Sequence, residues 1–135
     1  MAAYHALLGF AGWTLLLVIG VFAYRGLRFL QGTPINSWPR GAKPASDAPL
    51  VKRMEDAHAN CLENLPIFAV IVLVAGQLPG KLELIAGLAP LVLYARIGQS
   101  LAHLSGTGTL FVLLRATFWV AQLVLFVLML SKLFG

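Results

Sequence analysis

The sequence predicts an all-α integral membrane protein, a single domain in which four transmembrane helices form a bundle. Hydrophobic residues make up 59% of the 135 residues, charged residues only 11%, and the mean hydropathy is +0.85. A soluble domain of this size could not bury so many apolar side chains. A helix needs roughly 20 apolar residues to cross the hydrocarbon layer, and the sequence holds four such blocks. The blocks run over residues 4–24, 62–78, 82–101 and 110–133.

The blocks favour helices over the strands of an outer-membrane barrel. Leu, Val, Ile and Ala dominate them, without the alternation of polar and apolar residues that barrel strands require. The first block is not expected to be a cleaved signal peptide, because its basic residues, Arg25 and Arg28, follow the apolar run instead of preceding it. With their flanks, the expected helices cover residues 4–30, 51–77, 81–103 and 108–133. Pro66 and Pro90 are expected to kink two of them.

The segment from residue 31 to residue 50 is expected to be an irregular loop, because it is rich in proline and glycine. Basic residues cluster in and around it, whereas the turn near Lys81 holds a single lysine and the N-terminus none. By the positive-inside rule, the loop faces the cytoplasm and both termini lie outside; in a bacterial cell the membrane would be the inner one. The basic residues are Arg25, Arg28, Arg40, Lys43, Lys52 and Arg53.

Polar side chains recur at helical spacing in three of the expected helices. Residues three or four apart lie on one face of a helix, so each set forms a stripe. All the charges within these stripes fall in the cytoplasmic halves of the helices. The stripes are Arg53, Asp56, Asn60 and Glu63 in the second helix, Arg96, Gln99, Ser100 and His103 in the third, and Arg115, Trp119 and Gln122 in the fourth.

Charges inside a bilayer cost about 2.5 to 3.5 kcal/mol each on insertion scales, so such residues face a bundle interior or a wet cavity. Glu63 can pair with only part of the charge of Arg96 and Arg115, which leaves an excess of positive charge. This excess indicates a site for an anionic ligand. In the alternative interpretation, Glu63 pairs with one arginine only to fix the helix register. One cysteine, Cys61, excludes an internal disulfide.

Three segments resemble those of the MAPEG family, the membrane-associated proteins in eicosanoid and glutathione metabolism, in a bacterial-type form. "AHANCLENLPIF" resembles the second-helix signature, with an Asn and a Glu three residues apart before an apolar run with Pro. "YARIGQSLAH" resembles the third-helix segment, and "LLRATFW" the fourth-helix arginine. The resemblance covers essentially the whole chain.

The resemblance implies a homotrimer in the lipid bilayer, with active sites between neighbouring subunits. There, glutathione would be bound and transferred to lipophilic electrophiles, or used to reduce or isomerise them, with no metal and no nucleic acid involved. Carried over position by position, the polar pocket residues of the family match Asn60, Glu63, Arg96 and Arg115, with Arg25 at the end of the first helix. Glutathione has two carboxylates and one ammonium, which suits this charge pattern. Arg115 would lie near the sulfur as the catalytic residue and stabilise the thiolate.

The sequence departs from the family pattern at several positions. Ala59 stands where glutathione-using members often carry a basic residue. Gln99 and His103, still expected in the binding pocket, stand where the prostaglandin synthase branch has His and Tyr, and Ala116 and Trp119 replace a Ser and a Tyr of that branch. A tyrosine hydroxyl that would assist the thiol is therefore missing.

Three functions remain open at this point. The first is a glutathione-dependent transferase or peroxidase. The second is a non-catalytic member that binds a lipid or another ligand, which the residues at 116 and 119 favour. The third is a small transporter with one intramembrane Glu, although two arginines at a similar depth would repel a cationic substrate.

Overall fold

The fold is entirely helical in the part of the chain that the computed structural model describes, residues 1–39 and 44–135. Four segments in this part are long and apolar enough to cross a membrane: Ala2–Leu30, Pro49–Gln77, Lys81–Ser105 and Thr109–Phe134. The predicted all-α membrane fold is therefore confirmed. Arg40 and Lys43, two of the basic residues assigned to the loop, lie outside the described residues.

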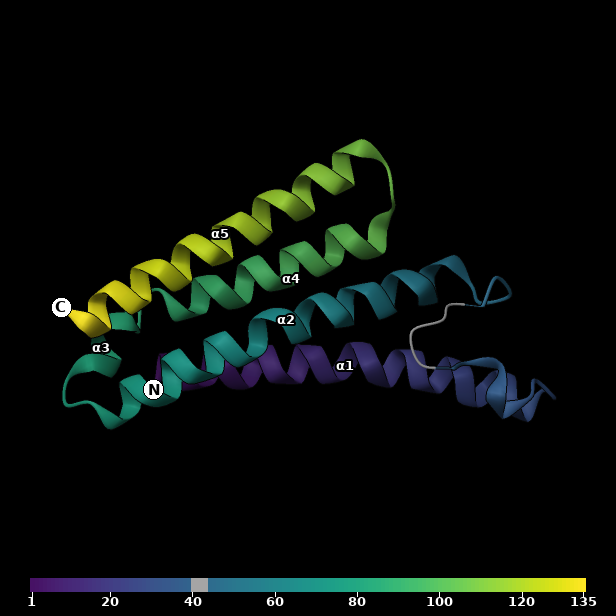
Figure 1. Cartoon of the computed structure of the whole chain (residues 1–135), viewed down its shortest axis with the longest axis horizontal. Helices are drawn as coiled ribbons and strands as arrows, with labels where there is room; N and C mark the ends of the chain where they lie inside the picture. The colour runs from purple at the N-terminus through teal and green to yellow at the C-terminus, as the bar shows by residue number, and fades with distance from the viewer. Residues whose placement is uncertain (40–43) are drawn as a thin grey trace.

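The helices run antiparallel, so the two termini lie at one end of the bundle and the long loop at the other (Figure 1). Helix α4 (Ala89–Ser105) contacts α1 (Ala2–Leu30), α2 (Pro49–Gln77) and α5 (Thr109–Phe134). The N-terminal half of α2, the C-terminal half of α4 and the N-terminal half of α5 consequently share the loop end. The loop itself contains a short 3₁₀ helix, η1 (Ile35–Ser37).

The third spanning segment is divided, where one helix over residues 81–103 was expected. A short helix, α3 (Lys81–Ile85), is followed by turns at residues 86–88 before α4 begins at Ala89. Pro90 lies in the first turn of α4, where the missing N–H has no helical partner in any case. Pro90 therefore starts a helix instead of kinking one. Pro66, by contrast, lies inside α2, which continues through it.

The apolar core includes three aromatic rings from three helices. Phe68 of α2 lies between Phe10 of α1 and Phe126 of α5, with ring centroids 5.6 Å and 6.2 Å apart. These separations are within the range that aromatic pairs prefer. The outward faces are also apolar: Phe22 is 76% exposed and Val127 65% exposed. Exposed apolar side chains on every long helix are what a lipid environment requires.

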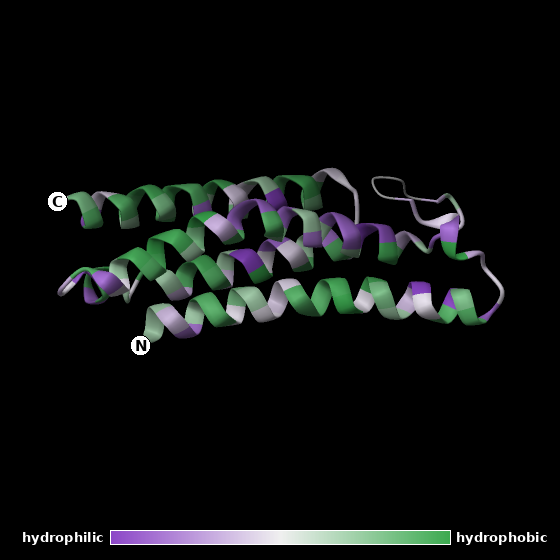
Figure 2. Cartoon of the chain, turned by 60° about the horizontal axis from the view of Figure 1, so that its bottom comes forward, coloured by the Kyte–Doolittle hydropathy of each residue, from purple (hydrophilic) through white to green (hydrophobic). Residues whose placement is uncertain are grey.

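Polar residues within the helices gather in the half of the bundle that carries the long loop, and the opposite half is mainly hydrophobic (Figure 2). In the polar half, α4 and α5 approach closely at Gly98. A Cβ atom there would lie 2.8 to 3.1 Å from carbon atoms of the Phe118 ring. A glycine at this position thus brings the neighbouring residue, Gln99, against α5.

Candidate functional site

A cavity of about 260 Å³ opens between α2, α4 and α5 in the polar half of the bundle. Its walls combine one carboxylate, one guanidinium and two amides with apolar and aromatic groups. A cluster of this kind is unusual within membrane-spanning helices, because each polar group there must be satisfied by the protein or by a ligand. The lining residues are Asn60, Glu63, Gln99, Val112, Arg115, Ala116 and Trp119.

Helical spacing explains how each element contributes its side chains. Asn60 and Glu63 are three residues apart and lie on one face of α2. On α5, the lining positions begin at Val112, continue one turn later at Arg115 and end one further turn on at Trp119. Both α2 and α5 run from the loop end of the bundle toward the termini, and these two faces line the same cavity.

Four of the expected site residues line this cavity: Asn60, Glu63, Gln99 and Arg115. His103 lies beside the cavity wall, where its Nδ1 is 3.3 Å from the amide nitrogen of Asn60. It is buried, with 6% of its surface exposed. The polar stripes of α2 and α4 are thus in direct contact.

Arg96 lies behind the cavity wall, in the interior of the bundle. It is fully buried, and its Nε donates a hydrogen bond of 3.0 Å to Oε1 of Gln122. Its guanidinium lies 5.3 Å from the centroid of the Phe10 ring, a distance typical of a cation–π contact. The two terminal nitrogens of Arg96 have no hydrogen-bond partner among the described residues.

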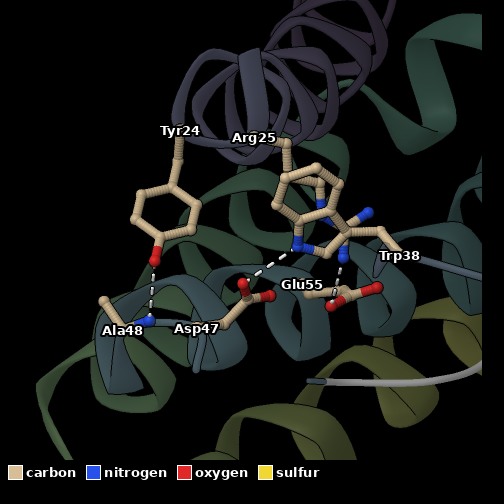
Figure 3. A network of polar contacts seen from close by, with 6 residues as sticks. All are labelled: Tyr24, Arg25, Trp38, Asp47, Ala48 and Glu55. Carbon is tan, nitrogen blue, oxygen red and sulfur yellow. Dashed lines mark hydrogen bonds and ion pairs between the residues drawn. The ribbon is translucent and has the colours of Figure 1, made fainter. Parts of the chain in front are cut away.

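Arg25 lies elsewhere in the chain, near the end of α1 (Figure 3). It forms an ion pair of 3.1 Å with Glu55 of α2, and its guanidinium lies 5.9 Å from the Trp38 ring. It borders a separate, largely apolar cavity of about 340 Å³ that is also lined by Phe22, Phe29 and Trp38. Arg25 is therefore not part of the cavity that Arg115 lines in the same chain.

Two further hydrogen bonds in Figure 3 hold the long loop, one within the loop and one between the loop and α1. The Trp38 Nε1–H donates to the Asp47 carboxylate at 2.9 Å, and the Ala48 N–H donates to the Tyr24 hydroxyl at 3.1 Å. Tyr24 thereby accepts a bond from the residue just before α2, whose first N–H groups have no partners within the helix. The loop is joined to α1 and α2 beside Arg25.

Gln122 is a buried residue that the sequence interpretation placed on a stripe but gave no role. Its Oε1 accepts hydrogen bonds from Arg96 and from Asn64 of α2, the latter at 3.3 Å. Its Nε2 donates to Oε1 of Gln99 at 2.8 Å and to the carbonyl of Phe118 at 3.1 Å. The signal for it in the sequence is a glutamine in the middle of α5, a mainly apolar helix. Gln122 joins three helices behind the cavity.

The charges on the cavity wall are not neutralised by one another. Glu63 is exposed on the surface of the chain, and no ion pair joins it to an arginine among the described residues. Glu63 is also the central residue of α2. A carboxylate at this depth is costly to leave against lipid.

Within residues 1–39 and 44–135, no group of three or more His, Cys, Asp or Glu side chains is arranged to hold a metal ion. Comparison with curated proteins gives no significant match. The sequence model of the MAPEG family matches residues 2–135, which include all four spanning segments and every residue of the cavity.

Proposed function

Because the chain belongs to the MAPEG family, we propose that it is a membrane enzyme that uses glutathione to conjugate or reduce lipophilic electrophiles. Family membership supports a glutathione-related function in the membrane. The observation that carries the proposal is the cavity in which Glu63 and Arg115, from α2 and α5, lie beside the amides of Asn60 and Gln99.

The chemistry of the cavity fits a glutathione molecule. The Glu63 carboxylate accepts hydrogen bonds from the glutathione ammonium, and the amides of Asn60 and Gln99 bind its peptide groups or carboxylates. Arg115 lies near the sulfur and stabilises the thiolate, which is the nucleophilic form. The buried Arg96 adds positive charge behind the wall, which favours the anionic parts of the ligand.

The reaction then follows from the thiolate. In conjugation, its sulfur forms a bond to an electrophilic carbon as the leaving group departs. In peroxide reduction, two glutathione molecules give the disulfide while the peroxide becomes an alcohol and water. Holding both substrates in one orientation supplies much of the rate gain. The bilayer side of the cavity admits the apolar substrate, next to Val112 and Trp119.

A second subunit is needed to complete this site. The cavity of about 260 Å³ is somewhat below the range of roughly 300 to 1,000 Å³ for small-molecule pockets. Glu63 on its rim also needs a cover other than lipid. A homotrimer with sites between subunits meets both needs. Arg25, which is remote from the cavity of its own chain, then binds a glutathione carboxylate in the site of a neighbouring subunit.

The polar half of the bundle is assigned to the cytoplasmic side. Arg25, Lys52 and Arg53 lie near this end of the helices, and the positive-inside rule places such residues in the cytoplasm. Glutathione would then enter from the cytoplasm, and the termini would face the other side of the membrane.

A second candidate function, a non-catalytic protein that binds a ligand, is favoured by two residues of the cavity. Ala116 and Trp119 both line the wall next to Arg115, and neither carries a hydroxyl group. In this alternative, Arg115 binds an anionic ligand without activating a thiol.

Calorimetric titration of the detergent-solubilised protein with glutathione and with S-hexylglutathione tests the proposal. We expect both to bind, the hexyl derivative more tightly because its chain is buried against the apolar wall. Turnover of an aryl halide or a lipid hydroperoxide then separates the enzyme from the binding protein. If neither glutathione nor S-hexylglutathione bound, the proposed function would be contradicted.

A further inference from the structure

A continuous chain of hydrogen bonds leads from Arg96 to the wall of the cavity. Arg96 Nε donates to Oε1 of Gln122 at 3.0 Å, and Nε2 of Gln122 donates to Oε1 of Gln99 at 2.8 Å. Gln99 is the last member, and it lines the cavity. The three side chains are 0%, 0% and 4% exposed, so no solvent competes along the chain.

The chemistry of the first member determines the direction of every bond in this chain. A guanidinium has donors only, so Gln122 must turn its oxygen toward Arg96. The Gln122 NH₂ group then points the other way and must meet an acceptor, which is the oxygen of Gln99. Consequently the NH₂ group of Gln99 is the group left facing the cavity.

Two further contacts hold Gln122 in this orientation. The amide nitrogen of Asn64 also donates to its oxygen, and the backbone carbonyl of Phe118 accepts from its nitrogen. A reversed Gln122 would place donor against donor at Arg96 and Asn64, and oxygen against oxygen at Phe118. Buried polar groups without partners are strongly disfavoured, so the reversed arrangement is excluded.

We propose that Gln122 is a positioning residue that holds Gln99 as a fixed hydrogen-bond donor, so that the cavity takes an acceptor-only group, a carboxylate or a thiolate, at this point. This inference deepens the proposed function and rests on it for the identity of the ligand. Gln99 contacts the ligand, and Gln122 acts through Gln99. A ligand that presents a donor-only group, such as an ammonium, at this point is rejected, since two donors face each other.

The variant Gln122→Glu reverses the polarity of the chain with little change of shape. A carboxylate accepts from Arg96 and from Asn64 but has no proton to donate to Gln99 or to the Phe118 carbonyl, so the variant also loses some stability at Phe118. The Gln99 amide must then rotate, donate its NH₂ group to Glu and present its oxygen to the cavity. Gln77→Glu is the matched control, because it makes the same chemical change at an exposed position at the far end of α2.

Side-chain amide exchange measures this rotation directly and needs no ligand. The sequence holds four glutamines, so selective ¹⁵N labelling gives a simple NMR spectrum that single substitutions assign. In the wild type we expect the Gln122 NH₂ protons to exchange slowly and the Gln99 NH₂ protons to exchange faster. In Gln122→Glu the Gln99 protons should become protected. Unchanged exchange at Gln99 in the folded variant would overturn the inference.

Ligand titration identifies the group that Gln99 binds. The probes are glutathione and its analogue in which a methyl group replaces the thiol. If the partner of Gln99 is the thiolate, Gln122→Glu should lower the affinity for glutathione about tenfold or more and leave the affinity for the analogue unchanged. If the partner is a carboxylate, the affinities for both probes should fall. Equal affinities of wild type and variant for both probes would contradict the inference.

Gln99→Met keeps the experiment decisive if Gln122→Glu does not fold. It removes the donor while Arg96 and Gln122 remain bonded to each other, and we expect the same loss of affinity. Wild-type affinity in Gln99→Met would refute a donor role for Gln99. If the wild type binds neither probe, the proposed function fails, and the amide exchange alone then decides whether Gln122 orients Gln99.

Discussion

Glu63 on α2 and Arg115 on α5 line the same cavity, yet no ion pair joins them in the part of the chain that the structure describes. A carboxylate whose main role is to fix helix register would instead contact an arginine directly. Both charges thus remain available to a ligand. This relationship leads to the first two predictions below.

Replacing Glu63 by Gln should weaken glutathione binding and leave the assembly intact. The substitution removes a charge that pairs with the ligand ammonium, so we expect about tenfold lower affinity or more in calorimetry. If Glu63 instead held the fold through a buried pair, the variant would lose roughly 3 to 5 kcal/mol of stability. A dissociated assembly with unchanged glutathione affinity would show that the ligand role is wrong.

Replacing Arg115 by Leu should remove thiolate formation. The bound thiol would lose its nearby cation, so the ultraviolet absorbance of the thiolate should disappear at neutral pH. The affinity for glutathione should fall less than the turnover, because the glutathione carboxylates contact residues other than Arg115. Turnover of a model electrophile should fall mainly in kcat, with KM little changed. If the wild type binds glutathione without a thiolate signal, the binding-protein alternative replaces the enzyme.

The assembly should be a homotrimer in mild detergent. We expect a neighbouring subunit because Glu63 is exposed at the centre of α2, where lipid would otherwise face its carboxylate. Light scattering or native mass spectrometry, with the detergent contribution subtracted, measures the mass. Monomers or dimers alone would argue against sites shared between subunits.

The hydrogen bond between the Tyr24 hydroxyl and the Ala48 N–H should stabilise the start of α2. Tyr24→Phe removes the acceptor, and we expect a loss of about 0.5 to 1.5 kcal/mol together with faster amide exchange at Ala48. Tyr94→Phe is the control, because Tyr94 is 64% exposed. Equal exchange at Ala48 in both variants would mean that this bond contributes nothing in the membrane.

The loop end of the bundle should face the cytoplasm. Gln77 and Thr107 are exposed at opposite ends of the bundle, and the native Cys61 is fully buried. An impermeant maleimide should label Gln77→Cys in intact cells, but Thr107→Cys only after the membrane is opened. The reverse labelling pattern would invert the topology and place the cavity outside.

The fold could be predicted from the sequence because each spanning helix is encoded locally, in a continuous apolar run. The break at residues 86–88 was not foreseen, although Pro90 marks its position. Hydrophobicity alone does not distinguish a kinked helix from two helices, since Pro is tolerated both inside a membrane helix and at its first turn.

The site was only partly predictable, because residue spacing defines a face of one helix and not the neighbour that this face meets. Residue spacing identified Asn60 and Glu63 as neighbours on one helix face, and both line the cavity. It could not distinguish Arg96 from Arg115, since both are single arginines in polar stripes. Their environments differ because Gln122 of another helix covers Arg96, and only helix packing brings the two together.

The position of Gln122 in the last helix bears on how the chain enters the membrane. The segment that carries Arg96 is the least apolar of the four, with a hydropathy of 1.4 against 2.1 for the segment that carries Gln122. Because Arg96 precedes Gln122 in the sequence, it is synthesised before the residue that accepts its Nε–H. Insertion of the third spanning segment is thus completed by its successor, and a chain that stops before Thr109 leaves a buried arginine without this partner.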